Sequence, residues 1–199
     1  MADIIVATTN RHKLEEYRRM LKDQAVEIGS LLDYPDFPEV EENGSTFAEN
    51  AGIKALAAAE FTGLPAFADD SGLEVEALGG APGIYSSRYA PTDPERIARL
   101  LKALENENCR KARFVCCIAI AFNGEVIAEF EGEVKGEIAS APRGADGFGY
   151  DPVFVPDGFD RTFGEMSAEE KDKISHRRRA LEQALEFVEE QLSAINALL

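Results

Sequence analysis

Residues 64–75 read Leu64-Pro65-Ala66-Phe67-Ala68-Asp69-Asp70-Ser71-Gly72-Leu73-Glu74-Val75, which places two adjacent carboxylates in an otherwise apolar frame. A buried carboxylate is costly unless a cation neutralises it. We therefore expect a metal ion, or a Lys or Arg side chain, beside Asp69 and Asp70. The segment predicts a strand over 66–68 that runs into a reactive turn at the two aspartates. The alternative is an ordinary turn held by an Asx hydrogen bond.

Strand and helix signals alternate on both sides of this segment. A β-rich run at 3–7 precedes helical spacing at 13–21, and Thr46 with Glu49 predicts a capping box for a helix that ends near Phe61. Further expected elements are a helix over 93–104 and a hairpin of strands 113–122 and 125–134 about the turn Asn123-Gly124. Intermixed strands and helices predict an α/β fold with a mixed sheet.

The last helix is expected to begin near Ser167 or Ser175. Its apolar positions step by three or four residues, which fits a coiled coil or, as we favour, a single helix packed on a sheet. These positions are Ile174, Leu181, Leu185, Val188, Leu192, Ile195 and Leu199.

Composition narrows the class of protein. The 199 residues are enough for one domain with a sizeable core or two lobes, and the net charge of −16 disfavours nucleic-acid binding. The longest apolar run, 114–122, is far shorter than the ~20 residues of a membrane span, and the N-terminus has no signal-peptide pattern. Three cysteines without a CxxC pair are expected to be reduced, so we expect a cytoplasmic protein.

Two segments have the residue types of a phosphate and metal site. Residues 8–13, Thr8-Thr9-Asn10-Arg11-His12-Lys13, lie at a predicted strand-to-helix junction, where hydroxyls, free backbone N–H groups and a lysine suit a phosphate; the alternative is an ordinary N-cap. Glu42 with Asp69, Asp70 and Ser71 would form the hard-oxygen site that Mg²⁺ prefers; the alternative for Glu42 is a solvated acidic loop.

Two further segments could recognise a base. In Gly147-Phe148-Gly149-Tyr150-Asp151-Pro152, glycines allow close backbone approach, the two aromatic rings offer stacking faces and Asp151 offers an acceptor; the alternative is a glycine-rich hairpin. The densest positive cluster runs from Lys171 to Arg179, at the expected start of the last helix. Cations there oppose the helix dipole, so we expect them to meet an anion or a base edge; the alternative is a solvated face paired with Glu residues.

Together these segments match a Mg²⁺-bound nucleoside triphosphate, and with no evident Ser-His-Asp set, two histidines and no CxxC pair, serine hydrolysis and zinc are disfavoured. Their order along nearly the whole chain resembles the inosine triphosphate pyrophosphatase family, with Ala145-Asp146 a departure from the Thr-Gly that the family often has. The matching segments are Ala7-Thr8-Thr9-Asn10 with Lys13, Thr46-Phe47-Ala48-Glu49-Asn50-Ala51 with Lys54-Ala55, Ala68-Asp69-Asp70-Ser71-Gly72-Leu73, Leu78-Gly79-Gly80-Ala81-Pro82-Gly83-Ile84-Tyr85-Ser86 with Arg88, Gly147-Phe148-Gly149-Tyr150-Asp151-Pro152 and Ser175-His176-Arg177.

The resemblance implies hydrolysis of ITP, dITP and XTP to the nucleoside monophosphate and pyrophosphate with Mg²⁺, to cleanse the nucleotide pool. It also implies an elongated α/β fold, a single domain over 1–199 with two lobes and a central cleft, and a homodimer. Glu42 and Asp70 would bind Mg²⁺, Asp70 would be the catalytic base, and Asp69 and Lys54 are further site candidates. The implied substrate-binding residues are Thr8, Thr9, Asn10, Arg11, His12, Lys13, Ser71, Phe148, Gly149, Tyr150, Asp151, Lys171, His176 and Arg177.

Asp70 is expected to activate a water that attacks the α-phosphorus, with Lys13 taking up charge on the leaving group. Donors from His176, Arg177 or the backbone would bond the 6-oxo group of the purine and reject a 6-amino group, whereas rejection of guanine must involve its 2-amino group. Three alternatives remain: a pyrophosphatase for pyrimidine or modified nucleotides, a nucleotide sensor without catalysis, and an aspartic protease, which would need a second copy of Asp70-Ser71-Gly72.

Overall fold

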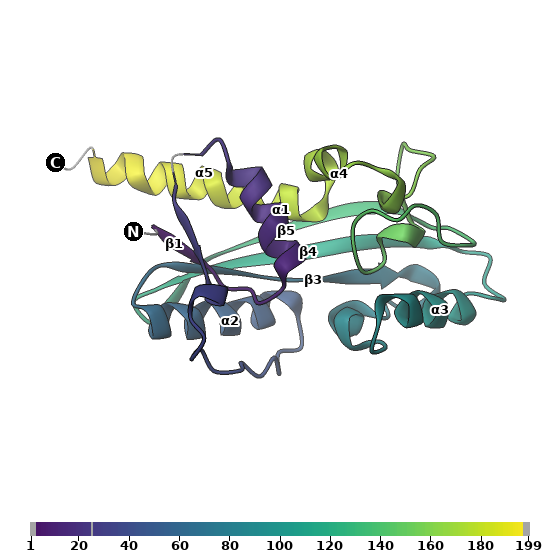
Figure 1. Cartoon of the computed structure of the whole chain (residues 1–199), viewed down its shortest axis with the longest axis horizontal. Helices are drawn as coiled ribbons and strands as arrows, with labels where there is room; N and C mark the ends of the chain where they lie inside the picture. Colours follow the sequence, from purple (N-terminus) through teal and green to yellow (C-terminus); the bar gives the residue numbers. More distant parts are fainter. Residues whose placement is uncertain (1–2, 25, 197–199) are drawn as a thin grey trace.

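A computed structural model describes residues 3–24 and 26–196 and shows one mixed sheet with helices on both faces (Figure 1). The strand order is β2-β1-β3-β4-β5-β6, with β1 parallel to β2 and β3 and the remaining pairs antiparallel. The strands are β1 Ile4–Val6, β2 Ile28–Ser30, β3 Ala66–Val75, β4 Lys111–Phe122, β5 Glu125–Ile138 and β6 Phe154–Pro156. The predicted α/β fold with a mixed sheet is confirmed.

The long helices cover opposite faces of this sheet. Helices α1 (Arg11–Leu21), α4 (Ala168–Ile174) and α5 (His176–Asn196) lie on one face, and α2 (Phe47–Thr62) and α3 (Asp93–Ala103) lie on the other (Figure 1). Short 3-10 turns link them: η1 Leu31–Asp33, η2 Glu76–Leu78, η3 Gly83–Arg88, η4 Asp151–Val153 and η5 Phe163–Glu165. Among the described residues, no helix is long and apolar enough to cross a membrane.

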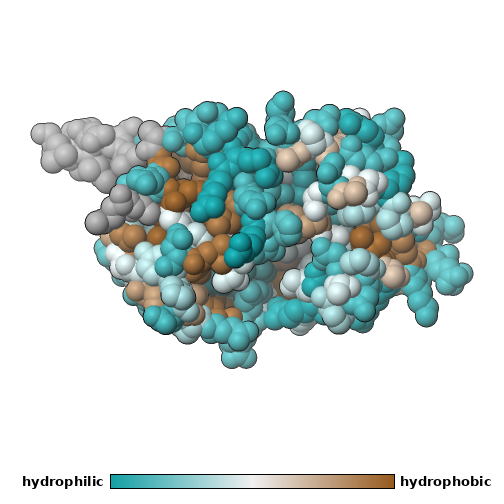
Figure 2. Space-filling view, in the orientation of Figure 1, coloured by the Kyte–Doolittle hydropathy of each residue, from teal (hydrophilic) through white to brown (hydrophobic). Residues whose placement is uncertain are grey.

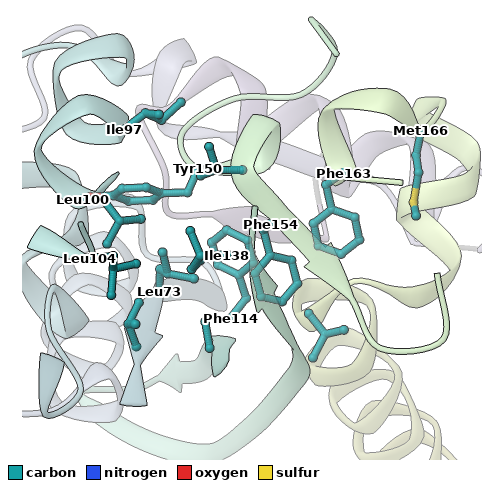
Figure 3. Close-up of a cluster of buried hydrophobic side chains, with 14 residues drawn as sticks. Leu73, Ile97, Leu100, Leu104, Phe114, Ile138, Tyr150, Phe154, Phe163 and Met166 are labelled. Carbon is teal, nitrogen blue, oxygen red and sulfur yellow. The ribbon is translucent and has the colours of Figure 1, made fainter. Parts of the chain in front are cut away.

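The apolar core gathers toward the two ends of the sheet. Around β1, the side chains of α1 and α5 pack on one face and the alanines of α2 on the other. At the far end, Phe114, Phe154 and Phe163 meet Leu73 and Leu100 in a separate cluster (Figure 3). On the surface, too, two groups of hydrophobic residues are separated by hydrophilic ones (Figure 2).

Strand β3 is much longer than predicted. The expected turn at Asp69 and Asp70 is wrong, because β3 pairs with β4 without interruption, from Ala66 opposite Ala121 to Val75 opposite Ala112. Strand β1 pairs with β3 only as far as Phe67, so beyond that residue this edge of β3 has no strand beside it within the described chain. The two aspartates therefore lie on the part of β3 that has no strand on this side, with their side chains buried.

Helix ends follow the predicted capping signals with small differences. Helix α1 begins at Arg11, two residues before the predicted start, because the Asn10 side chain caps it. The Thr46 hydroxyl caps α2 as predicted, but the Glu49 carboxylate accepts from Ser45 rather than returning to Thr46. The predicted hairpin turn is confirmed, with Asn123 and Gly124 both at positive φ.

The C-terminal segment forms two helices rather than one. Ser167 caps α4 and Ser175 caps α5, so both predicted starting points are used. Helix α5 packs on β5 and β4, which confirms the preference for a helix on a sheet over a coiled coil. Of its predicted apolar positions, Leu199 lies outside the described residues, as do the side chains of Leu192 and Ile195.

Candidate functional site

A cleft of about 840 Å³ lies along the free edge of β3. Its walls come from the β1–α1 loop, β3, α2, the segment 147–151 and the α4–α5 region. The predicted residues that line it are Thr8, Thr9, Asn10, His12, Lys13, Glu42, Lys54, Asp69, Asp70, Ser71, Phe148, Gly149, Tyr150, Asp151, Lys171, His176 and Arg177. Arg11 is exposed and does not line the cleft, because it begins the outer turn of α1.

The β1–α1 loop is more internally bonded than the sequence predicts. The Thr8 hydroxyl accepts from the Asn10 N–H at 3.1 Å, and the Asn10 side chain accepts from the N–H groups of His12 and Lys13 at 3.0 and 3.3 Å. The N–H groups of Asn10, His12 and Lys13 are therefore not free, contrary to expectation. The alternative interpretation of this segment as a helix N-cap also applies. What the loop offers the cleft is its side chains, above all the Lys13 ammonium.

Asp69 lies on the face of β3 that α1 and α5 cover, which we call the closed face, and cations surround it. Its Oδ2 is 2.8 Å from Lys13 Nζ and 3.3 Å from Arg177 Nε, and it accepts from the Ser71 hydroxyl at 2.9 Å. Burial by itself would raise the pKa of Asp69, but the charges of Lys13, Arg177 and Lys54 outweigh it and hold the pKa below its ordinary value. Asp69 is therefore a permanent anion that positions these cations.

A second buried carboxylate, which the sequence analysis missed, extends this arrangement. Glu16 on α1 binds Lys171 Nζ at 2.8 Å through one oxygen and an Arg177 nitrogen at 2.7 Å through the other. Lys171 in turn binds Asp151 at 2.6 Å. The available signal was helical spacing, since Glu16 follows Lys13 by three residues and shares its face of α1.

The buried ion pairs explain how the basic cluster from Lys171 to Arg179 is stabilised, although cations at a helix start oppose the helix dipole. Lys171 belongs to the last turn of the separate helix α4, where a cation is favourable. Arg177 lies in the first turn of α5, where Glu16 and Asp69 neutralise it. Arg178 and Arg179 bond to the Glu182 side chain and to the Glu133 carbonyl and do not line the cleft. The cluster is therefore divided: Lys171 and Arg177 meet buried carboxylates at the cleft, whereas Arg178 pairs with a Glu residue as the alternative interpretation predicted.

Asp70 points to the other face of β3, toward α2, and we call this the open face. Lys54 Nζ lies 3.0 Å from its Oδ1 and 3.6 Å from Glu42 Oε1, and Asn50 donates to its Oδ2 at 3.4 Å. Burial raises the pKa of Asp70, and the charges of Lys54 and Lys13 offset this only in part. Two carboxylate oxygens that face one ammonium are donors of the kind a hard divalent cation uses, so Glu42 and Asp70 fit such an ion.

The glycine-rich segment forms a tight turn at the cleft. Gly147 and Gly149 have φ of 75° and 62°, and a Cβ on Gly147 would lie 2.1 Å from an Asp151 oxygen, so glycine is required there. The N–H of Phe148 bonds to Asp151 at 2.8 Å, and that of Gly149 to Asp93 at 2.7 Å. Asp93, at the start of α3, is a cleft residue that the sequence analysis did not identify.

The two aromatic residues of this segment have different environments. The ring of Phe148 stacks on His12 with centroids 5.3 Å apart and lies 4.8 Å from Lys171 Nζ. Tyr150 is buried in the far apolar cluster, and its hydroxyl donates to the Ser86 carbonyl at 3.0 Å. Phe148 therefore already stacks on a cleft residue, His12, whereas Tyr150 anchors the segment to η3.

His176 contributes a buried imidazole to the cleft. Its ring stacks on Phe114 at 4.7 Å, and its Nδ1 has no hydrogen-bond partner among the described residues. Burial, together with the charges of Arg177 and Lys171, holds the pKa of His176 well below its ordinary value. Its surroundings therefore favour the neutral imidazole.

Comparison with known proteins shows which family the chain belongs to. Residues 4–187 match the Ham1 family, and the chain belongs to this family. It is 52% identical over 185 residues to the dITP/XTP pyrophosphatase of Gloeobacter violaceus, a match that covers 93% of each chain. The structure of a HAM1 protein from Coxiella burnetii has a TM-score of 0.87 at 46% identity and covers 96% of this chain and 100% of that one. The Staphylococcus aureus Ham1 protein has a TM-score of 0.84 at 42% identity and covers 94% and 98%.

Proposed function

We propose that this Ham1-family protein hydrolyses non-canonical purine nucleoside triphosphates, namely dITP, XTP and ITP, to the nucleoside monophosphate and pyrophosphate. Its relative from Gloeobacter violaceus is named a dITP/XTP pyrophosphatase. The observation that carries the proposal is the cleft itself, in which a carboxylate with a raised pKa faces lysines suited to phosphates and lies near a base-stacking ring. Removing such nucleotides would keep the nucleotide pool free of deaminated purines.

Asp70 is the general base. Its raised pKa makes it a better proton acceptor than an ordinary aspartate near neutral pH, and its position in the cleft lets it orient a water toward the α-phosphorus. The water adds to phosphorus, its proton goes to Asp70, and the bond to the bridging oxygen of pyrophosphate breaks. Lys13 stabilises the charge of the leaving group. Glu42 and Asp70 would hold Mg²⁺, which when bound would polarise phosphate oxygens.

Base selection belongs to the wall that carries Phe148, His176 and Arg177. The Phe148 ring is the stacking face. Three of the five Arg177 N–H donors already bond to Asp69, Glu16 and Ser71. These bonds fix the orientation of the guanidinium and so the direction of its two remaining N–H groups. Remaining donors from Arg177 and His176 would bond the 6-oxo group of hypoxanthine or xanthine. A 6-amino group would leave buried donors unpaired, a mismatch that discriminates strongly.

The domain organisation, the oligomeric state and the compartment are part of the proposal. We propose one domain with two lobes over residues 1–199, because a single sheet carries both apolar clusters. A homodimer in the cytoplasm is proposed from the family resemblance, and all three cysteines are unpaired, as a reducing compartment requires. Light scattering of the purified protein tests the homodimer.

A substrate panel tests the activity. Pyrophosphate release is measured for ITP, dITP, XTP, GTP and ATP, with Mg²⁺ and with a chelator in its place. We expect kcat/KM for the 6-oxo substrates ITP, dITP and XTP to exceed that for ATP by several powers of ten, and release to stop with the chelator. Equal values for ITP and ATP, or release of orthophosphate alone, contradict the proposal.

A further inference from the structure

Lys54 occupies the place between the two carboxylates of the open face. Its ammonium contacts Asp70 at 3.0 Å and Glu42 at 3.6 Å, and its side chain is 16% exposed. The Lys54 ammonium is within ion-pair distance of both carboxylates, so an internal cation lies where a divalent ion would have to bind.

Asn50 holds the same carboxylates in place from one turn earlier on α2. Its amide donates to Asp70 at 3.4 Å, and its carbonyl oxygen accepts from the Gly44 N–H at 2.8 Å, which ties down the loop that carries Glu42. A Cβ on Gly44 would lie 2.7 Å from that oxygen, so the loop can approach this closely only with glycine. Asn50 and Lys54 thus organise Glu42 and Asp70 without any bound ion.

The protein by itself offers few metal ligands at this site. Across residues 3–24 and 26–196, no group of three or more His, Cys, Asp or Glu side chains could hold a metal ion. With Lys54 in place, the charge offered by Glu42 and Asp70 falls from two negative charges to one. Mg²⁺ in proteins is commonly held by one or two carboxylates together with substrate phosphates. We therefore expect a divalent ion to bind Glu42 and Asp70 weakly until a nucleotide supplies phosphate ligands.

We propose that Lys54 is a built-in cation that keeps divalent ions out of the Glu42–Asp70 site until a nucleotide brings the ion in as its complex. The triphosphate carries more negative charge than Asp70 and offers the Lys54 ammonium a new partner. Once Lys54 turns to the phosphates, the two carboxylates are free to bind the ion. This inference rests on the proposed function and adds an order of binding to it.

Calorimetric titration of Mg²⁺ into the nucleotide-free protein tests the idea. We expect weak binding to the unaltered protein and binding at least about tenfold tighter to Lys54→Met, because a unit charge next to the site has been removed. Lys102→Met removes an exposed lysine from α3 and is the matched control, expected to leave the affinity unchanged. In thermal unfolding, Mg²⁺ should raise the Tm of Lys54→Met more than that of the unaltered protein.

Three outcomes overturn the proposal: tight Mg²⁺ binding by the unaltered protein without nucleotide, no gain in Lys54→Met, or an equal gain in Lys102→Met. If Lys54→Met does not fold, Lys54→Gln keeps a polar group and replaces it, and the measurement on the unaltered protein still decides. None of these titrations depends on turnover. Failure of the proposed function would instead appear as absent pyrophosphate release.

Discussion

Asp69 and Asp70 are neighbours in the chain but lie on opposite faces of β3, in two different electrostatic settings. On the closed face, Asp69 meets Lys13 and Arg177 and is almost fully buried. On the open face, Asp70 meets one ammonium, that of Lys54, at the cleft. The pKa of Asp69 is lowered and that of Asp70 is raised, so identical side chains differ in which charge state their surroundings favour.

In the proposed mechanism, the two faces of β3 have different roles: the ion pairs around Asp69 stabilise the structure, and Asp70 takes part in the reaction. On the closed face, ion pairs join Lys13, Asp69, Arg177, Glu16 and Lys171 into one chain of alternating charges. A chain of this kind is costly to break, because each removal leaves a buried charge without a partner. The open face has fewer partners and can exchange them, as a reaction requires.

Replacing the open-face carboxylate should abolish most activity and leave the fold intact. For Asp70→Asn we expect kcat to fall by about 10²–10⁴-fold, because the general base is lost. The free energy of unfolding should change by less than about 1 kcal/mol, since burial already disfavours the Asp70 charge. Pyrophosphate release and urea denaturation measure the two effects. Near-normal kcat would end the assignment of Asp70 as the base.

Replacing the closed-face carboxylate should act mainly on stability. For Asp69→Asn we expect a loss of about 3–5 kcal/mol in the free energy of unfolding, because Lys13 and Arg177 lose their shared anion. The control on the same strand is Glu74→Gln, which breaks a half-exposed pair with Arg113 and should cost less than about 1 kcal/mol. Equal losses in the two variants would remove the distinction between the faces.

Glu16 tests whether the closed face also serves substrate binding. Glu16→Gln weakens the hold on Lys171 and Arg177 without touching Asp70, so KM for ITP should rise about tenfold or more with a smaller change in kcat. The control is Glu182→Gln, whose exposed pair with Arg178 lies away from the cleft. A fall in kcat with KM unchanged would show that the network acts on the chemical step instead.

His176 gives a pH-dependent test of burial on the closed face. Its folded-state pKa is well below its ordinary value, so only the unfolded chain takes up a proton as the pH falls below about 6.5. The folded protein should therefore lose roughly 1 kcal/mol of stability between pH 7 and pH 5.5 that His176→Gln does not lose. Urea denaturation at the two pH values gives the comparison. Parallel losses in both proteins would mean that His176 is protonated in the folded state.

Local signals in the sequence predicted most of the fold and many of the residues that line the cleft, but not its walls at 37–40, 86–87 and Asp93. The caps at Thr46 and Ser175 and the Asn123-Gly124 turn depend on neighbouring residues, so spacing alone identifies them. The strand at Asp69 and Asp70 was cut short, because acidic residues disfavour strands locally and only pairing with β4 extends it. Arg11, a predicted substrate-binding residue, does not line the cleft, because a loop motif does not say which of its side chains faces it.

The sequence by itself determined the chemistry that is present: paired carboxylates, a lysine at a helix start, a glycine–aromatic segment and a basic cluster. Tertiary structure alone decided which charges meet. Arg177 reaches Asp69 across 108 positions of the chain, and Lys171 reaches Glu16 across 155. Spacing along one strand or helix sets which face a side chain occupies, but its partner comes from another element. Burial and the partners together shift the pKa of Asp69 and that of Asp70 in opposite directions.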